Sequence, residues 1–201
     1  MSIKNVVFDF GQVLVRFEPK YMVGVYVSDK DDASLLEEVV FDRLYWDKLD
    51  AGTIENEQVV EACRSRLPSR LWDVAEKIYY NWIYNIPEIE GMSALIDHIR
   101  SKYGVKVLLL SNISRYFASH ASEIPILSKI DKCIFSAPIG IVKPSRQIFE
   151  HLCTECDILP EQTIFIDDNA SNIAGAKAFG LGTYLFDGNP LALKEFLDNI
   201  L

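Results

Sequence analysis

The chain has 201 residues, of which 49% are hydrophobic and 24% are charged, so it can build a core and is not globally disordered. Its 20 Lys and Arg residues against 29 Asp and Glu residues give a formal net charge of −9, which would repel nucleic acid or an anionic membrane surface. We therefore expect no nucleic-acid partner and no membrane partner.

Three features of the sequence bear on membrane insertion and on the cellular compartment. The most apolar short run, Val105–Leu110, is far shorter than the roughly 20 residues that span a bilayer. The first residues run directly into an acidic strand end, without the apolar stretch and small-residue cleavage site of a signal peptide. A chain of this size does not need its four cysteines as disulfides. We expect a cytoplasmic protein, and its oligomeric state stays open.

The first predicted element is a strand. The run Ile3–Phe8 is short and nearly continuous in apolar residues, which is typical of a strand buried on both faces, and it ends at Asp9. Residues 16–87 contain no further strand-like run, whereas apolar residues recur there at helical spacing. We interpret residues 16–87 as a helical-bundle cap inserted after the first strand. Such an insertion would lie over the carboxyl ends of the strands, where ligands bind in open α/β sheets.

From residue 88 onward strands and helices alternate. Val105–Leu110 and Thr163–Ile166 repeat the strand pattern, and weaker runs at 132–136 and 183–186 add two more strands. Apolar residues at helical spacing occupy 92–99 and 173–179, Pro144 suits the first residue of a helix, and Asn189-Pro190 suits the start of the last one. The alternation predicts an α/β fold, with a Rossmann-like three-layer parallel-sheet core made of residues 1–15 and 88–201.

Candidate functional residues stand at the ends of the predicted strands and before one predicted helix. Asp9, Ser111 and the pair Asp167-Asp168 each follow a predicted strand, and Lys143 stands just before a helix. Because the carboxyl ends of parallel strands meet at one edge, these groups should converge on one crevice. A carboxylate can attack phosphorus, and Mg²⁺ prefers oxygen ligands. Adjacent carboxylates also repel one another unless a cation lies between them. The set indicates a site for a phosphoryl group and a divalent cation.

In this order the motifs carry a family resemblance that covers essentially the whole chain. The chain resembles the haloacid dehalogenase-like hydrolases that carry a helical cap between their first and second motifs. The motifs are Asp9–Leu14, Ser111-Asn112, Lys143-Pro144, and Asp167–Asn172 followed by Gly175-Ala176. The Asp-x-Gly-x-Val opening and the Ile-Asp-Asp-Asn-x-x-Asn-Ile ending look most similar to bacterial sugar-phosphate phosphatases of the glucose-1-phosphatase type.

The resemblance implies a Mg²⁺-dependent phosphatase for a small phosphorylated metabolite, expected to be a sugar phosphate. Asp9 would attack phosphorus and form an aspartyl-phosphate, which water then hydrolyses. Mg²⁺ would be bound by Asp9, the backbone carbonyl of Gly11 and Asp168, with Asp167 as a second ligand or a holder of metal-bound water.

The same resemblance assigns the phosphate-binding groups. The Ser111 hydroxyl and the backbone N–H of Asn112 would hold the transferring phosphoryl oxygens, and Lys143 would neutralise charge on the phosphate and the nucleophile.

One position departs from the family. Most of its phosphatases carry a second Asp two residues after the nucleophile, as general acid, and here that residue is Gly11. General acid–base catalysis contributes about 10²–10⁴-fold. The substrate could have a good leaving group, water or a cap residue could replace the acid, or the protein could be a weakened or non-catalytic binder of a phosphorylated ligand. A dehalogenase, in which Asp9 attacks carbon, is disfavoured by Asp167-Asp168 and by Gly11, where those enzymes usually carry Tyr.

The cap would then recognise the leaving group. We expect this role from residues that could face the crevice, namely Arg43, Tyr45, Trp46 and Lys48.

Overall fold

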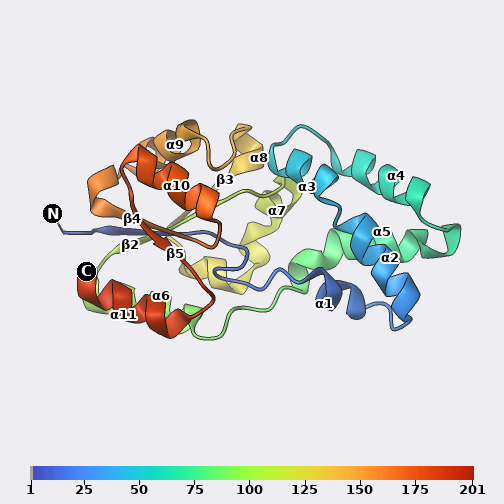
Figure 1. The fold of residues 1–201 in the computed structure, drawn as a ribbon, viewed down its shortest axis with the longest axis horizontal. Helices are drawn as coiled ribbons and strands as arrows, with labels where there is room; N and C mark the ends of the chain where they lie inside the picture. The colour runs from blue at the N-terminus through green and yellow to red at the C-terminus, as the bar shows by residue number, and fades with distance from the viewer. Residues whose placement is uncertain (1) are drawn as a thin grey trace.

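The computed structural model describes residues 2–201 and contains a five-stranded parallel sheet (Figure 1). Its order is β3-β2-β1-β4-β5, so the strand that ends next to Asp9 is central. The bounds are β1 Asn5–Phe8, β2 Lys106–Ser111, β3 Lys132–Phe135, β4 Thr163–Asp167 and β5 Gly182–Leu185. The predicted parallel sheet is confirmed, including both weaker strands.

Helices cover both faces of the sheet, because alternate side chains of each strand point to opposite sides. In Figure 1, α9 (Arg146–Cys156) and α10 (Ala170–Phe179) lie on one side of the sheet, and α6 (Met92–Tyr103) and α11 (Pro190–Ile200) lie on the other. Val7 and Phe165 belong to the hydrophobic cluster with α9 and α10, whereas Phe8 and Ile166 belong to the cluster with α6 and α11. Two short helices, α7 (Arg115–His120) and α8 (Ser136–Ile139), follow β2 and β3. The three-layer prediction is confirmed.

The helix predicted to begin at Pro144 begins later, so that prediction was wrong. Ser145 has ψ 142° and does not continue a helix, and α9 starts at Arg146. The Pro144 backbone instead packs against α10, where a Cβ added at Gly175 would lie 2.6 Å from the Pro144 carbonyl oxygen. Pro144 therefore belongs to a loop that is held against α10, next to Lys143.

The segment between β1 and α6 is helical, with no strand among residues 16–87 (Figure 1). Its helices are α1 Pro19–Gly24, α2 Lys30–Val40, α3 Arg43–Asp50, α4 Asn56–Arg66 and α5 Trp72–Asn81. Two of these helices, α2 and α3, begin with an aspartate as the N-cap residue. Asp29 accepts hydrogen bonds from the backbone N–H groups of Asp31 and Asp32, and Asp42 accepts one from Leu44. Such side-chain caps satisfy donors that the first turn of a helix leaves unpaired. None of the helices within residues 2–201 has the length and apolarity of a membrane span.

The inserted segment (residues 16–87) and the sheet share one hydrophobic cluster. Phe8 and Phe10 from the sheet side belong to the same cluster as Leu36 and Ile78 from the inserted helices. A chain of aromatic rings connects the two parts. Phe117 packs against Phe10 on the sheet side, with ring centroids 4.8 Å apart, and against Trp82 of the inserted segment at 5.6 Å. Within the segment, Trp82 packs against Phe17 at 5.4 Å. This packing holds the inserted helices over the carboxyl edge of the sheet.

The turn after α3 docks directly on α8. The Ser136 hydroxyl donates a hydrogen bond of 2.6 Å to the Asp50 carbonyl. Two residues later, Gly52 has φ 67°, and a Cβ there would lie 2.5 Å from the Ala137 carbonyl oxygen. Only a glycine allows both this left-handed conformation and this close approach.

We expect Gly52→Ala to lower the free energy of unfolding by roughly 2–4 kcal/mol, because it adds a strained φ to a backbone clash. Gly24→Ala is the matched control, since a Cβ at Gly24 meets nothing within 4 Å. Urea denaturation of both variants checks the prediction. Equal midpoints for the two would show that the turn moves away from α8 at little cost.

Candidate active site

A crevice of about 560 Å³ lies between the carboxyl edge of the sheet and the inserted segment. The predicted site residues that line it are Asp9, Gly11, Ser111, Asn112, Lys143 and Asp168. Asp167, the last residue of β4, is fully buried next to it. The strand register explains this convergence, because Phe8 is level with Leu109 and Ile166, and the Asp9 N–H donates to the Ile166 carbonyl at 2.9 Å.

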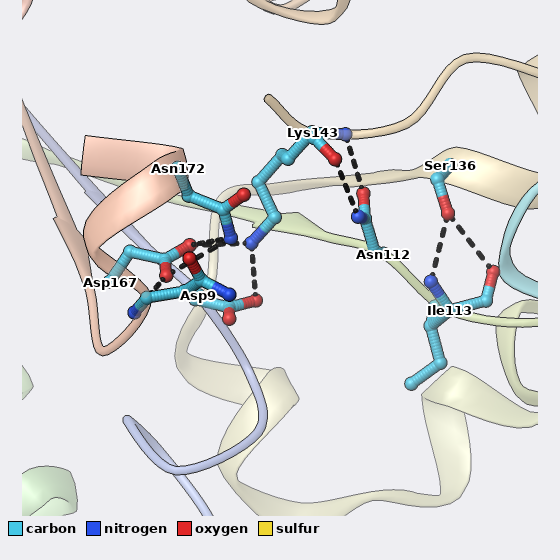
Figure 2. A network of polar contacts seen from close by, with 8 residues as sticks. Asp9, Asn112, Ile113, Ser136, Lys143, Asp167 and Asn172 are labelled. Carbon is cyan, nitrogen blue, oxygen red and sulfur yellow. Dashed lines mark hydrogen bonds and ion pairs between the residues drawn. The ribbon is translucent and has the colours of Figure 1, made fainter. Parts of the chain in front are cut away.

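Lys143 joins two of the predicted carboxylates (Figure 2). Its Nζ lies 2.8 Å from Asp9 Oδ1 and 2.7 Å from Asp167 Oδ2, and its side chain is 1% exposed. Burial lowers the pKa of this lysine, but the charges of Asp9 and Asp167 outweigh it and raise the pKa above its ordinary value. Lys143 is therefore a fixed positive charge at the bottom of the crevice.

Asp167 is held by donors on every side. Besides Lys143, Asn172 Nδ2 lies 3.1 and 3.0 Å from its two oxygens (Figure 2). The Asn169 N–H also donates to Oδ1 at 2.8 Å. Asp168, in contrast, is exposed and lines the crevice. Of the two carboxylates, Asp168 is the one that is open to a ligand.

Three carboxylates come together closely enough to hold one cation. One oxygen each of Asp9, Asp167 and Asp168 lie within 4.8 Å of one another. Burial raises the pKa of Asp9 to about 6, with Lys143 opposing the shift and Asp167 adding to it. Partial burial of the Asp168 carboxyl, together with the charge of Asp167, raises the pKa of Asp168. Three carboxylates against the single ammonium of Lys143 leave negative charge uncompensated. The donor set therefore suits a hard divalent cation such as Mg²⁺.

The side chain of Asn112 has a position that the sequence did not reveal. Its Nδ2 donates to the Lys143 carbonyl at 3.0 Å, and its Oδ1 accepts from the Lys143 N–H at 2.8 Å (Figure 2). Nearby, Ser136 Oγ accepts from the Ile113 N–H at 2.9 Å. These contacts fix the loop after β2 and the loop that carries Lys143. The partners lie 31 and 23 residues apart, so no spacing pattern could have predicted them.

The inserted segment supplies the other wall of the crevice. Along α3, the residues at positions i, i+3, i+4 and i+7 line it, namely Arg43, Trp46, Asp47 and Asp50. Arg43 and Trp46 thus lie where they were expected. Tyr45 and Lys48 do not line the crevice, because they lie on other faces of the helix: Tyr45 packs against the hydrophobic cluster and Lys48 is exposed. Helical periodicity starting from Arg43 could have found Asp47 and Asp50.

The sequence of this chain is similar to those of known proteins. Residues 3–180 match the haloacid dehalogenase-like hydrolase family. The chain is similar to the D-ribitol-5-phosphate phosphatase of Bacteroides thetaiotaomicron, at 27% identity over 90% of this chain and 91% of that protein.

Two solved structures share the fold. A predicted haloacid dehalogenase-like hydrolase of Porphyromonas gingivalis has a TM-score of 0.72 and 25% identity over 98% of both chains. An enzyme of the same family from Bacteroides thetaiotaomicron, solved with magnesium and inorganic phosphate, has a TM-score of 0.67 and 19% identity over 94% of this chain and 96% of that one.

Proposed function

Because the chain belongs to the haloacid dehalogenase-like hydrolase family, we propose that it is a Mg²⁺-dependent phosphatase that acts through an aspartyl-phosphate on Asp9. The observation that carries the proposal is the crevice in which Asp9, Lys143 and Asp168 meet, with three carboxylates close enough to share a cation. The phosphatase name of a relative that aligns over nine-tenths of this chain supports the same enzyme class.

In the proposed reaction, an Asp9 oxygen attacks phosphorus and the bond to the leaving oxygen breaks. Lys143 neutralises charge on the nucleophile and on the phosphoryl group from its fixed position between Asp9 and Asp167. Ser111 Oγ and the Asn112 N–H would bind the transferring oxygens. Phosphoryl transfer depends mainly on such positioning and electrostatic stabilisation.

The residues proposed to hold Mg²⁺ are Asp9, the Gly11 carbonyl and Asp168, with Asp167 beside them. The carboxylate cluster fits such an ion, and the ion would supply charge neutralisation that one lysine cannot give alone. Asp167 already accepts hydrogen bonds from Lys143, Asn169 and Asn172. It is therefore better placed to orient the cluster than to be the principal ligand.

We infer that the substrate is a small phosphorylated metabolite, and a sugar or polyol phosphate in particular. A volume of about 560 Å³ is in the range of small-molecule sites. Above the carboxylates, Arg43, Asp47 and Asp50 offer polar groups to a hydroxylated leaving group, and Trp46 and Trp82 offer apolar surface. The relative named for D-ribitol 5-phosphate supports a substrate of this kind.

The test is phosphate release from sugar and polyol phosphates, an acyl phosphate and 4-nitrophenyl phosphate, with Mg²⁺ and with EDTA. We expect turnover that requires Mg²⁺, because the carboxylates need a cation to bind an anion beside them. Turnover that is unchanged in EDTA would contradict the metal site. Halide release from 2-haloacids would instead favour attack at carbon, and binding of phosphorylated ligands without turnover would favour a non-catalytic protein.

A further inference from the structure

A phosphatase must also supply a proton. When the bond between phosphorus and an alcohol oxygen breaks, the electron pair stays on that oxygen, and an alkoxide is a poor leaving group unless it is protonated. The residue two positions after Asp9 is Gly11, which has no side chain to do this. The donor must therefore come from elsewhere in the crevice or from water.

Most titratable groups of the crevice are already engaged. The ammonium of Lys143 bonds to Asp9 and Asp167, and Asp168 belongs to the carboxylate cluster. Arg43 does not release a proton in proteins, and Asp47 forms an ion pair of 2.5 Å with it in a solvent-exposed position. The residues that line the crevice include no His, Cys or Tyr. Asp50 is the carboxyl group left over.

Asp50 is also firmly placed. It is the last residue of α3, its carbonyl accepts the 2.6 Å hydrogen bond from Ser136 Oγ, and the turn at Gly52 lies directly against Ala137. Asp50 lines the crevice on the wall that the inserted segment supplies, and its carboxyl group takes part in no ion pair or side-chain hydrogen bond among residues 2–201. A leaving group bound between the two walls would therefore meet Asp50.

From this arrangement, the geometry points to Asp50 as the general acid that protonates the leaving oxygen, in a role that rests on the proposed phosphatase activity. Asp9 Oδ forms a bond to phosphorus, the bond to the leaving oxygen breaks, and the Asp50 proton moves to that oxygen to give a neutral alcohol. In the second step, the Asp50 carboxylate takes a proton from the attacking water. The bond between phosphorus and Asp9 breaks, and inorganic phosphate and both starting carboxyl states are restored.

The electrostatic surroundings of Asp50 agree with this role. Burial raises the pKa of Asp50 to about 7; Arg43 opposes the shift, Asp47 and Asp9 add to it, and Lys143 opposes it. On the docking side, α8 carries no titratable residue, and Arg115 is paired with Glu55 at 3.2 Å. A pKa near the working pH is the best compromise for a group that must both give and take a proton.

The test compares leaving groups. We would measure kcat/KM with Mg²⁺ for 4-nitrophenyl phosphate, phenyl phosphate and D-ribitol 5-phosphate, in the parent and in Asp50→Asn. Since kcat/KM reports the step that expels the leaving group, we expect Asp50→Asn to lose about 10²–10⁴-fold on D-ribitol 5-phosphate but less than about tenfold on 4-nitrophenyl phosphate. Asp73→Asn is the matched control, because Asp73 is an exposed carboxylate on α5 that does not line the crevice, and it should change neither value by more than about threefold.

The pH dependence of kcat/KM gives a second test, which starts with the parent protein. In the parent, the preference for 4-nitrophenyl over phenyl phosphate should grow as the pH rises above about 7, where Asp50 loses its proton. Asp50→Asn should lack this change, and Asp50→Glu should restore part of it. An equal loss on all substrates, or a preference independent of pH, would overturn the role of Asp50. If the parent releases no phosphate from any of the three substrates, the proposed phosphatase function fails, and this role fails with it.

Discussion

Asp9→Asn is expected to lower kcat for phosphate release by at least about 10⁴-fold, on every substrate, since an amide cannot form the aspartyl-phosphate. The same variant should remain folded. Burial and the charge of Asp167 disfavour the charged Asp9 carboxylate, so replacing it with an amide removes an unfavourable contribution to the free energy of folding of the metal-free protein. Lys143 still forms its ion pair with Asp167 in this variant. Phosphate-release assays and urea denaturation at about pH 8 check both statements.

Asp73→Asn is again the matched control, because it removes an exposed carboxylate of the inserted segment that neither lines the crevice nor belongs to the cluster. A purified Asp9→Asn protein that keeps the parent's turnover would show that another group is the nucleophile. A loss confined to substrates with poor leaving groups would show that Asp9 acts only in proton transfer.

Lys143→Met should cost both stability and activity. Without the ammonium, Asp9 and Asp167 are left buried beside each other with no cation, and breaking a buried pair in this way costs about 3–5 kcal/mol of unfolding free energy. The loss should be larger at about pH 8 than at about pH 5. Burial already raises the pKa of Asp9 and Lys143 opposes that shift, so without the ammonium the Asp9 carboxyl binds its proton more tightly in the folded than in the unfolded state. The stabilisation that this proton gives disappears as the pH rises. Turnover should fall by about 10²–10³-fold.

The control for this prediction is Lys132→Met, which removes an exposed lysine paired with Glu155 and should change the unfolding free energy by less than about 1 kcal/mol. Urea denaturation at both pH values is the measurement. A loss that is equal at the two pH values would show that Lys143 contributes packing and not charge.

The sheet was predictable because its strands are short apolar runs that end in polar clusters, a pattern that local sequence carries by itself. Even the weak runs near Lys132 and Thr183 pair as expected, since each can extend an existing parallel sheet. The start of α9 was not predictable, because the position of Pro144 depends on its contact with α10, far away in sequence. The division into two domains, at residues 16 and 87, stays a prediction.

The site was predictable only in part. Strand ends indicated that Asp9 and Asp168 would meet, and the structure brings them together with Lys143. The roles assigned to these residues stay predictions until they are tested. The clamp of Asn112 on Lys143 and the docking of α3 on α8 depend on tertiary contacts between distant segments. Such contacts leave no periodic signal in one sequence.

The hydrophobic cluster shared by the inserted helices and the sheet has a consequence for how this protein can change over evolution. Trp46 and Trp82 line the crevice, yet both are buried members of that cluster, with ring centroids 5.2 Å apart. A substitution that reshapes the crevice at either tryptophan also removes core packing, which typically costs about 3–5 kcal/mol for a Trp-to-Ala change. New substrate preferences are therefore more accessible through Arg43 and Asp47, whose side chains reach the crevice from the exposed surface of α3.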